Sequence, residues 1–417
     1  MKTKNMIKFF TVVLMAAFIA APNLIQAQED EDEGFTIGGA VRYNIFDKSW
    51  VDTKTQPEFT WDTWRLNVDG SMAGVDLSFE YRFYPTFGTH FIHHGFLGYD
   101  LSDNLYMELG VTQVPFGITS FASHSWWFQG PYYVGLEDDY DMGVNFDYKP
   151  SDKLKLSFAY FRQAEPEGPI YGGDVTFGQA GPGRYSYDIT SGKEVLINDN
   201  DNNDVISEGD DVFNASIREL NQFNFRGAYN LNEDWQVGVS AQIGGIYNDY
   251  LDEIETSTVF AGHLVGNFGG FNLKSEYIQY NYKAKGAQIE NYGTSNEQVV
   301  STRTLDVVQM GAYGFNDQIA AEASLYVIGL AYSIDVDWGP ISNIQPYVDY
   351  TLIDKANDDF YDTEQLVPGM LVTAGSIYTY VDYAMGKNHS WFNGSQAETV
   401  EDSGWNSRFN INIGYYF

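Results

Sequence analysis

The chain has 417 residues, of which 57 are acidic and 23 are Lys or Arg, and the resulting formal net charge of −34 excludes nucleic acid as a partner. It contains no cysteine, which excludes a disulfide framework and thiol chemistry. Aromatic residues make up 17% of the chain although the mean hydropathy is only −0.31, and this combination favours strands with one apolar and one polar face over membrane-spanning helices.

The first 27 residues have the features of a cleaved signal peptide. Lys2, Lys4 and Lys8 precede a short apolar stretch from Phe9 to Ala21, and a cleavage position follows Ala27. We therefore predict an exported protein whose mature part, residues 28–417, forms a single domain. Loss of the three lysines makes that part still more acidic.

The segments that follow alternate between apolar and polar residues. Residues 35–46 place Phe35, Ile37 and Tyr43 on one face, and residues 73–84 repeat this pattern. Such alternation predicts strands with one buried and one solvated face. A soluble β-sandwich shows the same alternation, so this pattern alone does not choose between a sandwich and a barrel.

The lengths of the connections separate the two architectures. We count about 16 candidate strands. Short joints rich in turn-forming residues lie at 69–72, 102–104, 149–152, 230–234, 267–270, 337–340 and 374–376. Long polar segments lie between them, notably 116–139, 164–218, 281–322 and 386–405. Because outer-membrane barrels alternate short periplasmic turns with long external loops, we predict an all-β, transmembrane antiparallel β-barrel of about 16 strands.

The last ten residues, 408–417, form an alternating strand that ends on an aromatic residue. Its apolar face carries Phe409, Ile411, Ile413, Tyr415 and Phe417. A last strand must pair with the first so that no edge stays open in lipid. This segment resembles the terminal strand by which the barrel-assembly machinery recognises outer-membrane proteins. We therefore expect that machinery and outer-membrane lipid as partners.

Three short pieces resemble the phosphate-selective porin family called porin O and P. They are residues 114–117, residues 139–148 and residues 380–387. The resemblance implies a sixteen-stranded barrel, often trimeric, with an inward-folded third loop and a lumen lined by basic residues. On this resemblance, the segment 116–139 takes the place of the constricting loop, and its central side chains are Ser125, Trp126, Trp127 and Phe128.

Cationic side chains on the polar face of the strands are candidates for an anion path. Alternation assigns to that face Arg42, Arg65, Arg82, Arg226, Arg408, Lys155 and Lys274. Four of these arginines belong to the first three strands and the last one, so barrel closure makes them neighbours. A guanidinium group binds two phosphate oxygens at once. The prediction is a porin for passive diffusion of small hydrophilic solutes, with anions such as phosphate as candidate preferred solutes.

Acidic side chains on the same face leave the selectivity open. They are Asp69, Asp76, Glu80, Glu108, Asp141, Asp147, Glu276, Asp349 and Asp382. If these residues pair with the arginines, they stabilise the barrel wall and neutralise the positive charge of the arginines. The sequence does not decide between this structural role and an anion path.

Two other functions remain as alternatives to a porin. A surface receptor or adhesin with a plugged barrel is one, although the strands use nearly all of the mature chain and leave no plug domain. An outer-membrane barrel enzyme is the other. His263 falls on the polar face, but no serine and carboxylate can be placed beside it, and we predict that the protein is not an enzyme.

An acidic tract inside the segment 164–218 matches part of a calcium-binding loop. The matching residues are Asp199, Asp201, Asn203, Ser207 and Asp210. Asp204 stands where such a loop has glycine. The sequence does not decide whether this loop binds Ca²⁺ or is a solvated acidic loop, and no other cofactor is expected.

Overall fold

The computed structural model describes residues 34–119, 121–169, 181–191, 195–198, 210–397 and 403–417. The predicted signal peptide lies outside these residues and stays a prediction. Most of the predicted calcium loop, including Asp199, Asp201, Asn203 and Ser207, also lies outside them. No helix in the described part of the chain is long and apolar enough to cross a membrane.

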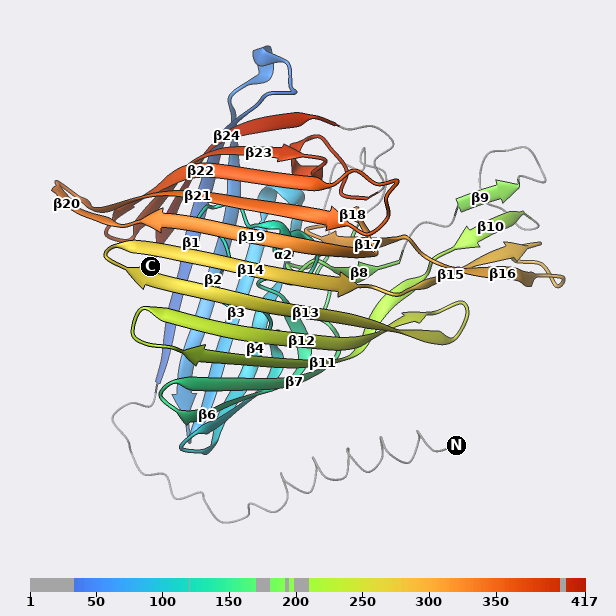
Figure 1. Cartoon of the computed structure of the whole chain (residues 1–417), viewed down its shortest axis with the longest axis horizontal. Coiled ribbons are helices and arrows are strands. Elements are labelled where there is room, and N and C mark those ends of the chain that lie inside the picture. The colour runs from blue at the N-terminus through green and yellow to red at the C-terminus, as the bar shows by residue number, and fades with distance from the viewer. Residues whose placement is uncertain (1–33, 120, 170–180, 192–194, 199–209, 398–402) are drawn as a thin grey trace.

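Antiparallel strands form a closed barrel, each pairing with the next along the chain (Figure 1). The wall strands are β1 (Gly34–Lys48), β2 (Glu58–Met72), β3 (Val75–Tyr84), β4 (Thr89–Ser102), β5 (Leu105–Gln113), β6 (Tyr140–Ser151), β7 (Leu154–Ala164), β11 (Ile217–Asn230), β12 (Trp235–Asn248), β13 (Glu253–Phe268), β14 (Phe271–Asn281), β19 (Glu322–Tyr332), β21 (Ile341–Lys355), β22 (Thr363–Ala374), β23 (Ile377–Lys387) and β24 (Trp405–Tyr416). The short β20 (Ile334–Trp338) follows β19 and pairs with the same neighbour, β21. The predicted 16-stranded barrel is confirmed.

Pairing of the first and last strands closes the wall. β1 and β24 are antiparallel from Ala40 to Lys48. Beyond that ladder, Gly39 and Phe417 exchange two backbone hydrogen bonds, of 2.9 and 3.1 Å. A side chain on Gly39 would stand 2.4 Å from the carbonyl oxygen of Arg65, so glycine is required there. The terminal aromatic residue therefore takes part in the closure that the sequence predicted, and no wall strand keeps an open edge in lipid.

The connections alternate as predicted. At one end of the barrel the strands are joined by short turns, such as Gly269 and Gly270, whose φ angles of 55° and 86° suit a tight hairpin. At the other end lie the long connections. We name them L3 (residues 114–139), L4 (165–216), L6 (282–321) and L8 (388–404).

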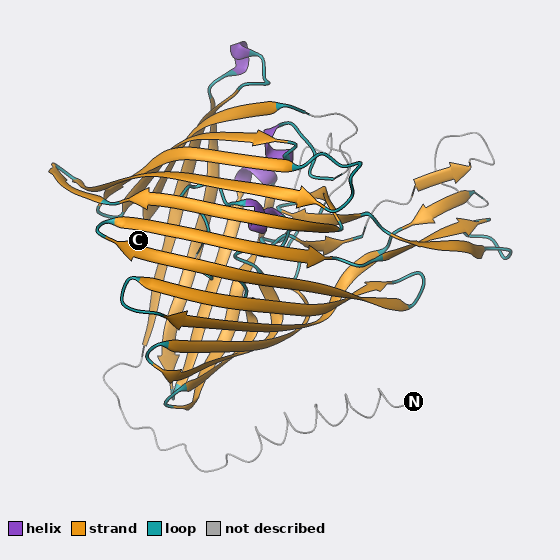
Figure 2. Ribbon diagram, in the orientation of Figure 1, coloured by secondary structure: helices purple, strands orange, loops and turns teal. Residues whose placement is uncertain are grey.

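The long loops carry secondary structure of their own (Figure 2). L3 contains the one-turn helix α2 (Gly130–Tyr133), and the described residues elsewhere include the 3₁₀ helices Thr53–Thr55, Pro85–Phe87 and Ser390–Phe392. Strands in L4 and L6 are β8 (Asp188–Thr190), β9 (Val195–Asn198), β10 (Asp211–Asn214), β15 (Lys285–Glu290), β16 (Gln298–Thr304), β17 (Val307–Ala312) and β18 (Phe315–Ala320). They form two small sheets, β16-β15-β10-β9, which projects from the barrel, and β18-β17-β8.

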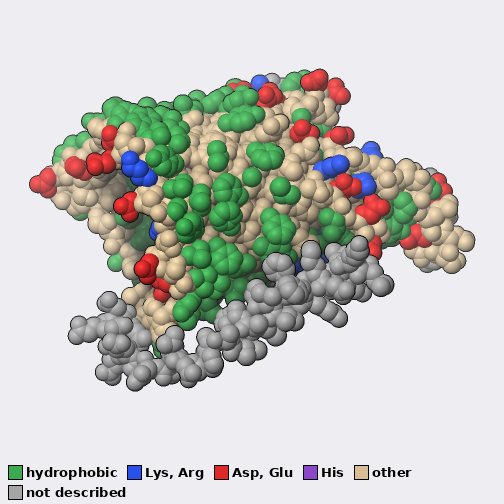
Figure 3. All heavy atoms as spheres, turned by 60° about the horizontal axis from the view of Figure 1, so that its bottom comes forward, with side chains coloured by type: hydrophobic (Ala, Val, Ile, Leu, Met, Phe, Trp, Pro, Cys, Tyr) green, Lys and Arg blue, Asp and Glu red, His purple; other side chains and the backbone are tan. Residues whose placement is uncertain are grey.

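The outer surface of the wall is apolar. Large hydrophobic side chains point outward along the strands, and Ile37 and Phe59 are each 72% exposed. Figure 3 shows these side chains spread over the barrel wall, with acidic and basic groups gathered toward its ends. Trp61 and Trp405 lie exposed near strand ends, as expected of an interfacial aromatic girdle, whereas the exposed Trp64 lies near the middle of β2. Such a surface is stable in lipid and not in water.

We expect Val239→Arg in β12 to destabilise the barrel by about 2–4 kcal/mol, the cost of a cation on the lipid face near the bilayer centre. Val239 is 57% exposed and lies between glycines of the neighbouring strands, where no anionic partner is adjacent among the paired residues. Unfolding by denaturant in lipid vesicles measures the change, and Val239→Leu is the matched control. Equal stability of Val239→Arg and wild type would show that this face is not in lipid.

The inside of the barrel is partly filled by its own loops. Tyr132 from L3, Tyr185 and Tyr187 from L4 and Tyr313 from L6 pack together, with ring centroids 5.4 to 6.4 Å apart. Trp391 from L8 joins them through a 2.9 Å hydrogen bond from its Nε1 to the hydroxyl of Tyr187. Four residues of this aromatic cluster, Tyr132, Tyr185, Tyr313 and Trp391, also line the cavity described next.

Candidate functional site

L3 lies inside the barrel, against the inner wall. The backbone N–H groups of His124 and Ser125 donate to Asp349 of β21 at 2.7 and 2.8 Å. Gly117, near the start of the loop, donates to the hydroxyl of Ser240 on β12 at 3.0 Å. Gly130 donates to Thr351 on β21 at 3.2 Å. These bonds fix L3 against β12 and β21 on one side of the interior.

Two of the predicted pore cations hold this loop. Arg226 donates through Nε to the carbonyl oxygen of Gly117 at 2.7 Å. Lys274 donates through Nζ to the carbonyl oxygens of Phe121 and Ser123 at 2.6 and 3.0 Å. Arg226 and Lys274 therefore both help to position L3. Lys155 lies apart from both, 2.8 Å from Asp147.

A cavity of about 470 Å³ lies between L3 and the strands β24, β1, β2 and β3. The wall contributes cationic side chains, and L3 contributes the four central residues singled out in the sequence, Ser125, Trp126, Trp127 and Phe128. The cations that line it are Arg42, Lys48, Arg65, Arg82 and Arg408. Four of the seven predicted cations are thus brought together, on the neighbouring strands where barrel closure puts them.

Carboxylates compensate these cations only in part. Arg42 lies 2.9 Å from Asp62, and Glu80 pairs with both Arg82 and Arg65. Arg65 and Arg82 stand directly opposite each other on β2 and β3, and Glu80 offsets the repulsion between them. With Glu58 beside Lys48, five cations face three carboxylates. The mixed pairing that the sequence left open does occur, and it leaves an excess of positive charge.

Arg408 is the least compensated of the arginines. It is buried, and its guanidinium carbon lies 3.8 Å from the ring centroid of Phe46 and 4.9 Å from that of Trp127. Among the residues that the structure describes, its Nε has no hydrogen-bond partner. Cation–π contacts with these two rings hold the guanidinium group in place at the edge of the cavity.

Sequence reasoning missed Asp62 because of a β-bulge. The register between β1 and β2 shifts after Arg42, so that Thr63 opposes Arg42 while Trp61 opposes the next residue, Tyr43. Asp62 is the extra residue of the bulge and points inward, and Trp61 points outward, opposite to what strict alternation from Arg65 gives. Phe46 could have been found, since it shares the face of Arg42.

Neither the family models nor the curated protein sequences give a match to this chain. Solved structures match it in fold. The outer membrane channel DcaP of Acinetobacter baumannii shares 12% identity over 94% of this chain and 99% of its own, with a TM-score of 0.55. An anion-selective porin from Comamonas acidovorans shares 11% identity over 93% of this chain and all of its own, with a TM-score of 0.54.

A third match is the outer membrane protein OmpT of Vibrio cholerae in its trimer form. It shares 12% identity over 93% of this chain and 100% of its own, with a TM-score of 0.53. These similarities extend over nearly the whole of each chain. They establish that this protein has the barrel fold of outer-membrane porins.

Proposed function

We propose that the protein is an outer-membrane channel through which small hydrophilic anions diffuse passively along the basic wall of β24, β1, β2 and β3. The observation that carries this proposal is the excess of cations over carboxylates in the cavity, in a chain whose net charge is −34. A path with this local charge raises the concentration of anions within it and excludes cations. The fold shared with a porin described as anion-selective supports the same function.

Phosphate is the anion that the arginine set fits best. Arg65, Arg82 and Arg408 offer planar guanidinium groups to one cavity, and each such group binds two oxygens of a phosphate or carboxylate. A chloride ion offers this fork a single acceptor atom, whereas phosphate offers two oxygens. We therefore infer that inorganic phosphate dwells longer in the channel than chloride does.

We expect added phosphate to reduce the chloride current, since a bound phosphate occupies the path. In the double variant Arg65→Lys and Arg408→Lys the charge is kept and the planar fork is lost. That variant should stay anion-selective while the phosphate concentration for half block rises by roughly tenfold, the effect of losing about one charge-assisted hydrogen bond. Planar-bilayer recording measures both quantities. If phosphate blocked the wild type and the variant at the same concentration, the guanidinium forks would not bind phosphate in the channel.

The proposed setting follows from the barrel and from the sequence. The apolar wall would lie in outer-membrane lipid, the signal peptide would direct export, and the barrel-assembly machinery would insert the chain. We also propose a homotrimer, which the family resemblance and the trimeric structural match support. Crosslinking of the folded protein, followed by electrophoresis without heating, tests the trimer.

A surface receptor is the second candidate function, and a specific observation favours it. The aromatic cluster of L3, L4, L6 and L8 fills part of the barrel mouth, as a plug would. A receptor closed by its own loops would insert into bilayers and carry no current. Liposome swelling in small sugars and salts separates the two functions, because only an open channel lets the solute follow water.

A further inference from the structure

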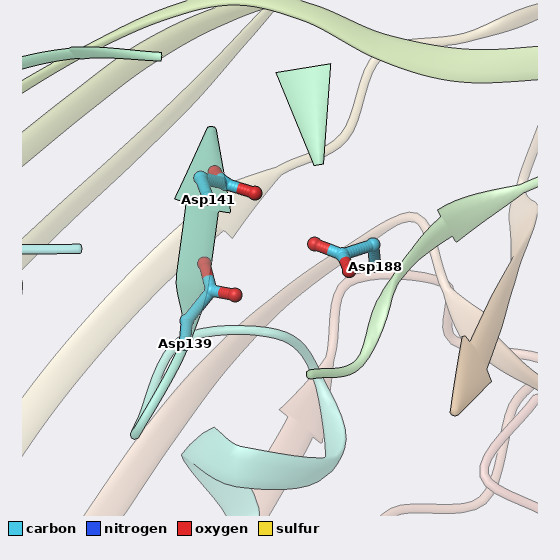
Figure 4. A group of neighbouring side chains, drawn as sticks. All are labelled: Asp139, Asp141 and Asp188. Carbon is cyan, nitrogen blue, oxygen red and sulfur yellow. The ribbon is translucent and has the colours of Figure 1, made fainter. Parts of the chain in front are cut away.

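We infer that Asp139, Asp141 and Asp188 form a buried calcium site that fastens L4 to the end of L3. Figure 4 shows the three carboxylates turned toward one another: Asp139 is the last residue of L3, Asp141 lies at the start of β6, and Asp188 begins β8 in L4. One oxygen from each lies within 4.8 Å of the others. The residues are 6%, 1% and 1% exposed, so water does not screen their mutual repulsion.

Buried oxygens without a donor point to a missing cation. Oδ1 of Asp139 and Oδ1 of Asp141 each lack a hydrogen-bond partner among the described residues. A fourth carboxylate, Glu165, is 2% exposed, and its Oε2 likewise lacks a partner in that part of the chain. Glu165 lies close enough to Asp188 for the two to interact strongly. Buried polar atoms in proteins are almost always satisfied, so this concentration of unsatisfied oxygens needs a ligand.

The charges around the site do not balance without such a ligand. Glu219 adds a fifth carboxylate, and its Oε1 accepts from the backbone N–H of Ile189 at 3.0 Å. Arg184 is the one cation that faces the group within the described residues, with NH1 3.3 Å from Asp188 Oδ2. Four buried carboxylates and the half-buried Glu219 against one guanidinium require either bound protons or a metal ion.

Protons are the competing explanation. Burial, together with Asp188 and Glu219, raises the pKa of Asp139 well above its usual range, and burial and Asp188 do the same for the pKa of Glu165. A divalent cation held by the three aspartates would replace protons there and satisfy the free oxygens of Asp139 and Asp141 at once. Oxygen donors select a hard ion, and a buried set that supplies several carboxylates suits Ca²⁺ better than Mg²⁺, which keeps most of its waters.

The position of the site gives it a structural consequence. The carbonyl oxygen of Asp139 accepts from Val114 at 2.8 Å, which joins the two ends of L3. The backbone N–H of Tyr140 donates to Ser186 of L4 at 2.9 Å. An ion between Asp139 and Asp188 would therefore fix L4 over the base of the loop that borders the cavity. None of the three aspartates lines the cavity, so the calcium site does not depend on the proposed function.

Calcium binding to the refolded full-length chain tests this inference. The protein in detergent is stripped with EDTA and dialysed against CaCl₂, and bound calcium is measured by elemental analysis. The key variant is Asp139→Asn with Asp188→Asn. The comparison variant is Asp199→Asn with Asp201→Asn, which removes acids of the loop that the sequence singled out. Gel mobility without heating checks that each barrel is folded, and Asp188→Asn alone serves if the double variant is not.

We expect the key variant to bind one Ca²⁺ fewer per chain than wild type and the comparison variant to leave this site intact. CaCl₂ should raise the Tm of wild type by several degrees and leave the key variant unchanged. The key variant should also be the more stable of the two in EDTA, because neutral amides remove the repulsion. Equal calcium content in wild type and key variant would overturn the site. A larger rise in Tm with MgCl₂ than with CaCl₂ would overturn its assignment to calcium.

Discussion

Replacing Arg65 and Arg408 by glutamine is expected to abolish the anion selectivity of the channel. The cavity holds five cations against three carboxylates, so the loss of two charges brings it close to neutral. The ratio of chloride to potassium permeability should fall by roughly tenfold toward unity, in line with the local enrichment that a charged cleft produces. The fold should survive, because Glu80 keeps Arg82 as its partner.

Arg218→Gln with Arg303→Gln is the matched control for that variant. It removes the same net charge at positions outside the cavity, where Arg218 pairs with the exposed Asp249 and Arg303 lies in the projecting sheet. Its permeability ratio should equal that of wild type. If both double variants changed the ratio alike, selectivity would reflect the overall charge of the protein and the basic wall would have no special role.

Asp349→Ala is expected to release L3 and to widen the channel. The Asp349 carboxylate is 1% exposed and accepts from the backbone of His124 and of Ser125, and it also lies 2.9 Å from Nδ1 of His124. Its loss leaves one buried and one part-buried N–H group without an acceptor, which costs about 3 kcal/mol of stability. Single-channel conductance should rise and become noisier as the loop leaves the wall.

Asp354→Ala on the same strand is the control. Asp354 is exposed, whereas Asp349 is buried against L3. It should change neither conductance nor stability. The conductance and the stability of Asp349→Asn should lie between those of the two alanine variants, since its one carbonyl oxygen can still accept from the loop. An unchanged conductance in Asp349→Ala would mean that L3 does not limit the flow of ions.

The barrel could be predicted from the sequence because its signals are local. Alternation along strands such as 73–84, turn residues at each short joint and the aromatic end of the last strand all depend on near neighbours in the chain. Lipid outside the wall keeps that alternation strict. The four clustered arginines followed from parity and closure alone, without any knowledge of the loops.

The rest of the site depends on contacts that no local pattern contains. Lys274 and Arg226 have the right parity for a pore, but more than 100 residues separate each of them from the L3 carbonyls they bind. The inward orientation of Asp62 was not predicted because a one-residue bulge reverses the faces of β2 at that point. Asp188 meets Asp139 only through the path of L4 across the barrel mouth, and loop paths carry no periodic signal.

The reversal potential of the wild-type channel under a salt gradient is the measurement to make first. The refolded protein is inserted into a planar bilayer with concentrated KCl on one side and dilute KCl on the other. We expect a potential whose sign shows that chloride crosses more readily than potassium. A potential of the opposite sign would contradict the anion path along the basic wall. Insertion without any current would contradict the channel itself and favour a receptor closed by its own loops.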